Sequence, residues 1–269
     1  MQPLIDRAWR VGPWVALVLA CGCTPLPRPS GAPASSAAAM EAPALQTAML
    51  LPAAPKPGSP RYEADRQVFL ATRKLAGTPR WALAIHDVDY TTPVLLDDFS
   101  CAMGVPLDAT RLPGLTALVD QTSRAANDST GPAKQANQRQ RPFLIDQGTV
   151  CQSTFQLAHS FDYPSGHASR GWAVGLVLAE LAPDRASDLL LRSRAFADSR
   201  VVCGAHNLSA IEAGAMNGAA VVAILRTSAV FQAQLSAARA ELAEYRKATP
   251  SNAGPHCAAE KSLIEPTPY

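Results

Sequence analysis

The chain has 269 residues, enough for one sizeable hydrophobic core or for one domain with appendages. Its formal net charge of +2 is too small for the basic surface that nucleic-acid binding requires, so we expect no binding of a nucleic-acid polymer. Hydrophobic residues make up 48% of the chain and aromatic residues 6%, which favours an alanine-rich helical protein.

The N-terminus has the pattern of an export signal. A positively charged stretch precedes an apolar run over 11–20, which is well short of the ~20 residues that span a bilayer. A small residue directly before Cys21, followed by a run of Pro, Ala and Ser, resembles a bacterial lipoprotein signal. We therefore predict a signal peptide over 1–20 and a periplasmic protein with its lipid anchor on Cys21. Lipidation of Cys23, and an ordinary secretory signal that yields a soluble secreted protein, are the alternatives.

Pro, Ala and Ser continue to dominate the following residues, and we predict a semi-extended tether over 21–59. Ser59-Pro60 has the chemistry of an N-cap followed by the first helical residue. The folded domain is therefore expected over 60–248, with a C-terminal tail over 249–269.

Helical patterns follow in chain order. Apolar residues recur at helical spacing from Val68 until Gly77 ends the run, and Thr78-Pro79 starts a second helix. Further helices are expected over 113–122, in a short basic helix or turn around Lys134, over 168–181, from Pro183 to near Arg200, over 209–225 and over 230–246. The run over 168–181 is apolar on nearly every face, and its length fits a buried central helix. Only the short stretch 200–202 resembles a strand, so we predict an all-α fold, a single compact helical bundle.

Four cysteines would remain in the mature domain: Cys101, Cys151, Cys203 and Cys257. An even number in an oxidising periplasm favours disulfides, with three pairings open. A Cys151–Cys203 bridge would stiffen the loop beside His206, but the sequence does not decide the pairing. No cysteine or histidine spacing is typical of a zinc site.

Three short stretches carry chemistry in combination. They are Lys134-x6-Arg141-Pro142, Pro164-Ser165-Gly166-His167 and Ser199-Arg200-x5-His206. Taken singly, each is more typical of a solvated basic face, a turn before a helix or a structural histidine. Their order and spacing together resemble the signature of the type 2 phosphatidic-acid phosphatase superfamily, and within it the secreted bacterial class A non-specific acid phosphatases.

The resemblance extends to the stretches "GTPRWALA", "QRQRPF", "YPSGHASRGWA", "SRVVCG" and "FQAQL", and so covers roughly residues 60–245. It implies a helical bundle of the acid phosphatase and vanadium haloperoxidase type. It also implies that His206 attacks phosphorus to form a phosphohistidine and that His167 protonates the leaving alcohol. Neither step requires a metal or another cofactor.

The residue types fit a phosphoryl group, whose charge is spread over three non-bridging oxygens. Lys134, Arg141 and Arg200 supply cations from three segments, and an arginine can hold two oxygens at once. Ser165 and Gly166 precede an apolar helix, so free N–H groups and the positive end of the helix dipole can face an anion.

The chain departs from the family pattern in one place. The pattern continues His-x3-Asp, and the Asp holds the other ring nitrogen of the histidine, but the residue here is Ala210. Loss of an orienting acid predicts a rate penalty between ~10 and ~10⁴ unless another group compensates. Glu212 is one candidate orienter, and Asn207, Ser209 or a backbone carbonyl are the other candidate acceptors of the ring N–H. However, Ser209-x-x-Glu212 also matches a capping box, and positions 210 and 212 differ by about 200° around a helix.

Two functions of different kinds remain open from the sequence. The first is a metal-independent periplasmic phosphomonoesterase of broad specificity, which would bind small phosphomonoesters and inorganic phosphate. The second is a catalytically weakened homologue that binds phosphate esters without hydrolysing them, because the orienting Asp is replaced by Ala210. A vanadium haloperoxidase is less favoured, since nothing in the sequence marks a halide site. We expect contact with a membrane only through the lipid anchor, and a homo-oligomer remains open.

Overall fold

The computed structural model describes residues 45–251 and 254–269, and every regular element in these ranges is a helix, as predicted. The expected signal peptide, Cys21 and Cys23 lie outside the described residues. The α-helices are α1 (Thr47–Leu50), α2 (Pro60–Thr72), α3 (Pro79–His86), α4 (Thr92–Asp98), α5 (Ser100–Met103), α6 (Pro113–Asp128), α7 (Gly131–Asn137), α8 (Thr154–Leu157), α9 (Gly166–Leu181), α10 (Ala186–Val202), α11 (Leu208–Leu225), α12 (Ala229–Ala248) and α13 (Pro255–Ile264). The short 3₁₀ turns are η1 (Arg73–Leu75), η2 (Pro142–Leu144) and η3 (Pro183–Arg185).

The starts of the first long helices follow the expected capping chemistry. The Ser59 hydroxyl accepts a hydrogen bond from the Tyr62 N–H at the start of α2, with proline at the first helical position. Thr78 caps α3 in the same way through the Trp81 N–H. Both prolines lose no hydrogen bond there, because the first N–H groups of a helix have no partner within it.

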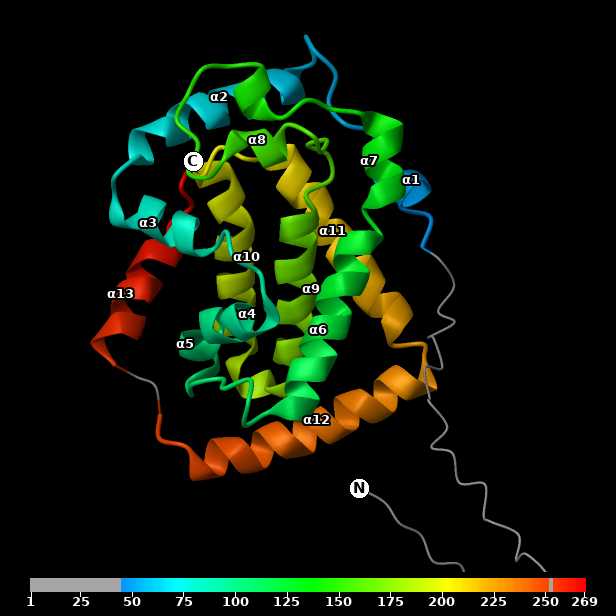
Figure 1. Ribbon diagram of the computed structural model, residues 1–269, viewed down its shortest axis with the longest axis vertical. Helices are drawn as coiled ribbons and strands as arrows, with labels where there is room; N and C mark the ends of the chain where they lie inside the picture. The colour runs from blue at the N-terminus through cyan, green and yellow to red at the C-terminus, as the bar shows by residue number, and fades with distance from the viewer. Residues whose placement is uncertain (1–44, 252–253) are drawn as a thin grey trace, which may run out of the picture. The chain divides into compact units, whose positions relative to one another are not determined.

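Helix α9 is the centre of the fold, with α6, α10 and α11 packed around it (Figure 1). Its apolar residues Val174, Val177 and Leu178 are fully buried, as expected for a central helix. Glycine allows α9 to approach its neighbours closely. A Cβ at Gly175 would lie 1.6 Å from the Ser193 Oγ on α10, so only glycine fits at this crossing.

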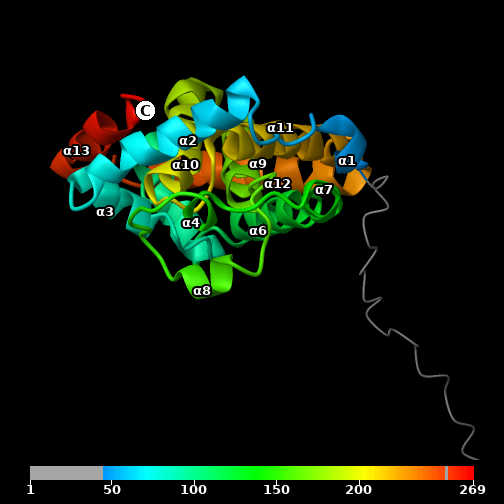
Figure 2. The same ribbon diagram turned by 90° about the horizontal axis from the view of Figure 1, so that it is seen from above.

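Two helices cover α9 and its neighbours from other directions. Helix α12 crosses below α6 and α9 in Figure 1 and packs against α6. Helix α2 packs on α10 and α11, and Figure 2 shows it on one side of these helices while α8 projects on the other.

The folded part extends further in both directions than the sequence indicates. The predicted tether over 21–59 includes α1, which packs against α7, and the Tyr163 hydroxyl donates to the Pro52 carbonyl over 2.9 Å. The predicted tail over 249–269 includes α13, which a Cys101–Cys257 disulfide attaches to α5. The second disulfide joins Cys151 to Cys203, the pairing considered from the sequence.

Helix α11 has the length and apolar composition of a membrane span, with a mean hydropathy of 1.6, but it is a core element here. It packs along α9, and the fully buried Asn217 amide donates to the Ala126 carbonyl and to the Ser169 hydroxyl. Buried amides that bond neighbouring helices are typical of the interior of a globular domain.

Candidate active site

Five of the predicted site residues come from five segments and lie toward the end of α9 at which His167 stands. They are Lys134 on α7, Arg141 before η2, His167 in the first turn of α9, Arg200 near the end of α10 and His206 before α11. The close packing of α9 against α10 and α11 brings the last three together. Burial lowers the pKa of His206 well below its usual value, and the charges of Arg141, Lys134 and Arg200 lower it further. The charges of Arg200 and His206 also lower the pKa of His167, so these groups lie close enough to affect one another.

His206 is 4% exposed, and both of its ring nitrogens have partners. Its Nδ1 lies 2.9 Å from the Asp162 Oδ1, and its Nε2 lies 3.0 Å from the Arg141 Nη1. A carboxylate can only accept, and a guanidinium can only donate. Together these partners fix one tautomer, with the proton on Nδ1 and the lone pair on Nε2.

Asp162 was not singled out from the sequence. It is fully buried, and Asn207 bonds it twice, from its N–H over 3.2 Å and from its Nδ2 over 2.9 Å. Arg139 adds a longer ion pair, with its Nε 3.6 Å from the Asp162 Oδ2. The residue stands just ahead of the Tyr-Pro-Ser-Gly-His stretch, but no fixed spacing from His206 marks it.

Glu212, the candidate orienter, does not contact His206. Its side chain is 54% exposed and forms an ion pair with Arg61 on α2. The capping-box prediction is also wrong, because the Ser209 N–H donates to Asp65 over 2.9 Å instead of to Glu212. Helix α11 starts at Leu208, so position 210 faces the interior and position 212, about 200° further around the helix, faces outward.

Neutral oxygens hold two of the three predicted phosphate-binding cations. The Arg141 Nε donates to the Ser160 carbonyl over 2.7 Å, and its Nη1 donates to the Ala205 carbonyl over 2.8 Å. The Lys134 Nζ donates to the Phe161 carbonyl over 2.5 Å. Main-chain dipoles therefore position these cations without cancelling their charge.

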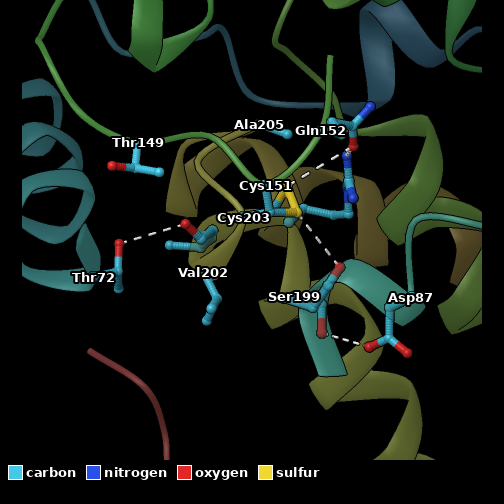
Figure 3. The surroundings of a disulfide bond; sticks show 12 residues. Thr72, Asp87, Thr149, Cys151, Gln152, Ser199, Val202, Cys203 and Ala205 are labelled. Carbon is cyan, nitrogen blue, oxygen red and sulfur yellow. Dashed lines mark hydrogen bonds between the residues drawn. A yellow bond between two sulfur atoms is a disulfide. The ribbon is translucent and has the colours of Figure 1, made fainter. Parts of the chain in front are cut away.

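Arg200 is nearly fully buried, and its Nη2 donates to the side-chain amide oxygen of Gln152. Within the described ranges, its Nε and Nη1 have no hydrogen-bond partner. The Cys151–Cys203 disulfide fixes the segment that carries Gln152, and Figure 3 shows Gln152 beside this bridge. Buried guanidinium N–H groups without acceptors are expensive, so this arginine is poised to take up oxygens from a ligand.

The pKa values of these cations are lowered, in each case mainly by burial. Burial, and next the charge of Arg141, lower the pKa of Lys134 to about 8. Burial and Arg141 lower the pKa of Arg200 to about 10. Crowded, desolvated cations are costly on their own, and a bound anion would relieve that cost.

His167 stacks on Phe196 of α10, with the ring centroids 4.2 Å apart and the planes inclined by 7°. Its Nε2 is buried and has no hydrogen-bond partner among the described residues. Burial lowers the pKa of His167 well below its usual value, and the charges of Arg200 and His206 lower it further. The half-exposed Tyr90 meets the His167 ring edge-on, with the centroids 5.7 Å apart.

Ser165 and Gly166, in the turn before α9, have structural roles in addition to the phosphate binding predicted from the sequence. The Ser165 hydroxyl caps α9 by accepting from the Ala168 N–H over 3.2 Å. A Cβ at Gly166 would lie 2.8 Å from the Asn127 Oδ1, so glycine is needed here for the contact with α6. Both residues stay candidates for phosphate contact through their position at the N-terminus of α9.

In the described part of the chain, one cluster has the chemistry of metal ligands: Cys101, His256 and Cys257, beside α13. The two sulfurs form a disulfide, so neither is available as a thiolate. The role of this cluster is therefore structural, because its disulfide attaches α13 to α5.

Known proteins resemble the chain in sequence over most of its length. The family model of the PAP2 superfamily matches residues 116–233. An acid phosphatase of Zymomonas mobilis subsp. mobilis is 41% identical over 201 residues, which cover 73% of this chain and 76% of that protein. Non-specific acid phosphatases of Salmonella typhimurium and Providencia stuartii are each 33% identical, over 71% and 76% of this chain and over 78% and 84% of their own lengths.

The chain belongs to the PAP2 superfamily, whose helical fold it has. Within that superfamily it is an acid phosphatase.

Proposed function

We propose that the protein hydrolyses phosphomonoesters in the periplasm through a phosphohistidine on His206, without a metal ion. The observation that carries this proposal is the His206 ring, whose Nε2 lone pair faces the cations of the site while Nδ1 is held by Asp162. An unprotonated imidazole nitrogen whose lone pair is held only by a hydrogen bond from Arg141, a cation that a phosphate oxygen can draw away, is suited to attack phosphorus.

In the first step, the Nε2 lone pair of His206 forms a bond to phosphorus, and the bond from phosphorus to the ester oxygen breaks. The leaving oxygen takes a proton from the His167 Nε2, which must carry that proton when substrate is bound. Burial and the neighbouring cations disfavour the charged form of His167 in the empty site. A bound phosphate anion reverses this effect, so substrate binding and protonation of His167 support each other.

In the second step, neutral His167 accepts a proton from water, and the water oxygen bonds to phosphorus as the phosphorus–nitrogen bond breaks. Inorganic phosphate leaves, and His206 regains its lone pair. Lys134, Arg141 and Arg200 stabilise the charge on the transferred group in both steps. A protonated His167 is required first, so we expect the highest activity at mildly acidic pH.

The placement of the polar groups supports the proposed broad specificity. The cations and both histidines would bind the phosphoryl group. The leaving group would contact the half-exposed ring of Tyr90 beside His167, and an aromatic ring accepts apolar groups of many shapes. The two disulfides support an oxidising compartment such as the periplasm. The alternative of a weakened binding protein is based on the missing acid at 210, and the contact of Asp162 with the His206 ring supports hydrolysis over that alternative.

The test is hydrolysis of p-nitrophenyl phosphate by the wild type, by His206→Ala and by His167→Ala, each with and without EDTA. We expect His206→Ala to abolish turnover and EDTA to leave the wild type unchanged. Quenching in base, where phosphohistidine survives, should trap labelled phosphate on the wild type and none on His206→Ala. Full activity of His206→Ala, or inactivation by EDTA that added metal restores, would refute the mechanism.

The lipid anchor is tested separately. Expressed in bacteria with labelled palmitate, the wild type should be labelled and sediment with membranes, and Cys21→Ser should be unlabelled. Labelling that persists in Cys21→Ser but is lost in Cys23→Ser would move the anchor to the second cysteine.

A further inference from the structure

We propose that Asp162 is the positioning residue of the reaction, and that it replaces from the turn before α9 the acid that is absent at position 210. The proposal depends on the nucleophilic role of His206 given above. The assignment starts from a contact, because the Asp162 Oδ1 is the partner of the His206 Nδ1 at 2.9 Å.

The carboxylate is itself held firmly. Its Oδ1 accepts from the ring and from the Asn207 N–H, so one oxygen fixes both the imidazole and the main chain that follows it. Its Oδ2 accepts from the Asn207 Nδ2, and the Asp162 N–H donates to the Arg139 carbonyl over 2.9 Å. A fully buried group with this many partners has little freedom, which is what a residue that orients a nucleophile requires.

Ala210 has a packing role in the core beside the turn. Ala210 is fully buried against Tyr163 and Ala213, and its carbonyl accepts from the Ser165 N–H over 2.9 Å. The segment that follows Asp162, residues 163–165, therefore lies against the first turn of α11. Because of this, a carboxylate at 162 reaches the His206 ring from the turn, and a methyl group at 210 leaves room for that turn.

The negative charge of Asp162 would stabilise the reacting ring, and neighbouring side chains stabilise that charge. Attack on phosphorus makes the His206 ring cationic, and a carboxylate on Nδ1 stabilises that cation. Burial raises the pKa of Asp162 above its usual value, and Arg139, Asn207 and Arg141 offset part of that rise and so favour the carboxylate. Arg139 in turn pairs with the buried Asp65 over 2.8 Å, so the arginine links two carboxylates of which only one contacts the ring.

Asp65 provides the matched control. Like Asp162, it is buried and paired with Arg139, and it accepts from a main-chain N–H on the α11 side, that of Ser209. Unlike Asp162, its partners are Arg139 and Ser209 and not the His206 ring. A purely structural role for Asp162 would make Asp162→Asn and Asp65→Asn alike, whereas a positioning role would separate them.

The experiment compares Asp162→Asn, Asp65→Asn and the wild type in three measurements. These are kcat and KM for p-nitrophenyl phosphate, thermal unfolding, and ¹⁵N chemical shifts of the histidine ring nitrogens in the intact protein. An asparagine at 162 can donate to Nδ1, which favours the wrong tautomer. We therefore expect kcat to fall by about 10²- to 10⁴-fold, with KM changed far less. The His206 proton should move from Nδ1 to Nε2 in this variant alone.

Asp65→Asn should lower the unfolding temperature to a similar degree, keep kcat within about tenfold of the wild type and leave the His206 tautomer in place. The proposal is wrong if Asp162→Asn keeps the wild-type tautomer, or if both variants lose the same amount of kcat. These failures differ from failure of the proposed function. An active His206→Ala would refute the function, whereas an inactive His206→Ala beside a fully active Asp162→Asn would refute only the positioning role.

Discussion

The rings of His167 and Phe196 lie face to face, 4.2 Å apart, across the interface between α9 and α10. Gly171 on α9 lies against the Phe196 ring, where a Cβ would be 2.3 Å from the Phe196 Cδ1. The absence of a side chain at 171 therefore sets the position of the ring on which the proposed general acid stacks.

Gly171→Ala should displace Phe196 and with it the His167 ring. We expect the variant to lose about 1–3 kcal/mol of unfolding free energy through overpacking and about 10- to 100-fold in kcat through misplacement of the ring. Gly175→Ala overpacks the same interface one turn away, against Ser193, and should destabilise without a comparable loss of kcat. Denaturant unfolding and steady-state kinetics on both variants check this. An equal loss of kcat in the two would show that helix packing in general, and not the stacked ring, is responsible.

Ala210→Asp, which restores the family pattern in the sequence, should not improve the enzyme. The new carboxylate would be buried beside Tyr163 and near Asp162, so we expect a loss of about 2–5 kcal/mol in unfolding free energy and lower activity. In an Asp162→Ser background the same change should recover at least about tenfold of the lost kcat, because one acid would then replace the other. A rise in kcat for Ala210→Asp alone, measured on p-nitrophenyl phosphate, would show that His206 is not yet oriented in the wild type.

Binding of inorganic phosphate should weaken as the pH rises through about 8. Burial and Arg141 lower the pKa of Lys134 to about 8, so its positive charge is present below this pH and is lost above it. Affinity measured by calorimetry should fall by up to about tenfold per pH unit above that point. In Lys134→Arg the weakening should begin at a higher pH, since a guanidinium keeps its proton. A wild-type affinity that is level from pH 7 to 9.5 would contradict this prediction.

The two disulfides should differ in their effect on catalysis. Removal of the Cys151–Cys203 bridge, which joins residues 52 apart, should cost up to about 4 kcal/mol of stability and raise KM, because Gln152 then loses its fixed place beside Arg200. Removal of Cys101–Cys257 should destabilise at least as much but leave KM unchanged, since it frees α13 and not the site. Paired serine variants, followed by thermal unfolding and kinetics, test the difference. An unchanged KM without the first bridge would mean that Gln152 does not position Arg200.

The sequence predicts those parts of the structure that depend on neighbours along the chain. Ser59 and Thr78 begin helices as expected, because a cap is satisfied within one turn. The short helices α4, α5 and α8 are missed, since one or two turns give no periodic pattern. Helix α13 is held by Cys101–Cys257, and four cysteines allow three pairings, so its attachment follows only from the fold.

In the site, too, local features were predictable from the sequence and long-range contacts were not. The three motifs, through their resemblance to the phosphatase signature, are enough to predict both histidines and the three cations. In the structure the Arg141 Nη1 lies 3.0 Å from the His206 Nε2, and the charges of Lys134 and Arg200 act on the same ring. The sequence does not predict the role of Asp162, because its partner His206 lies 44 residues away and no rule of local spacing connects the two. Glu212 was a candidate because it lies close to His206 along the chain. Its position on α11, however, places its side chain at the surface, where it pairs with Arg61.

The neutral oxygens of Gln152, Ser160, Phe161 and Ala205 have a consequence for turnover. Since they hold the cations without neutralising them, the emptied centre retains a strong attraction for any small oxyanion, including the one the reaction releases. Hydrolysis should therefore slow as its own inorganic product accumulates, in competition with fresh ester. In surroundings rich in orthophosphate the enzyme would be largely occupied and idle.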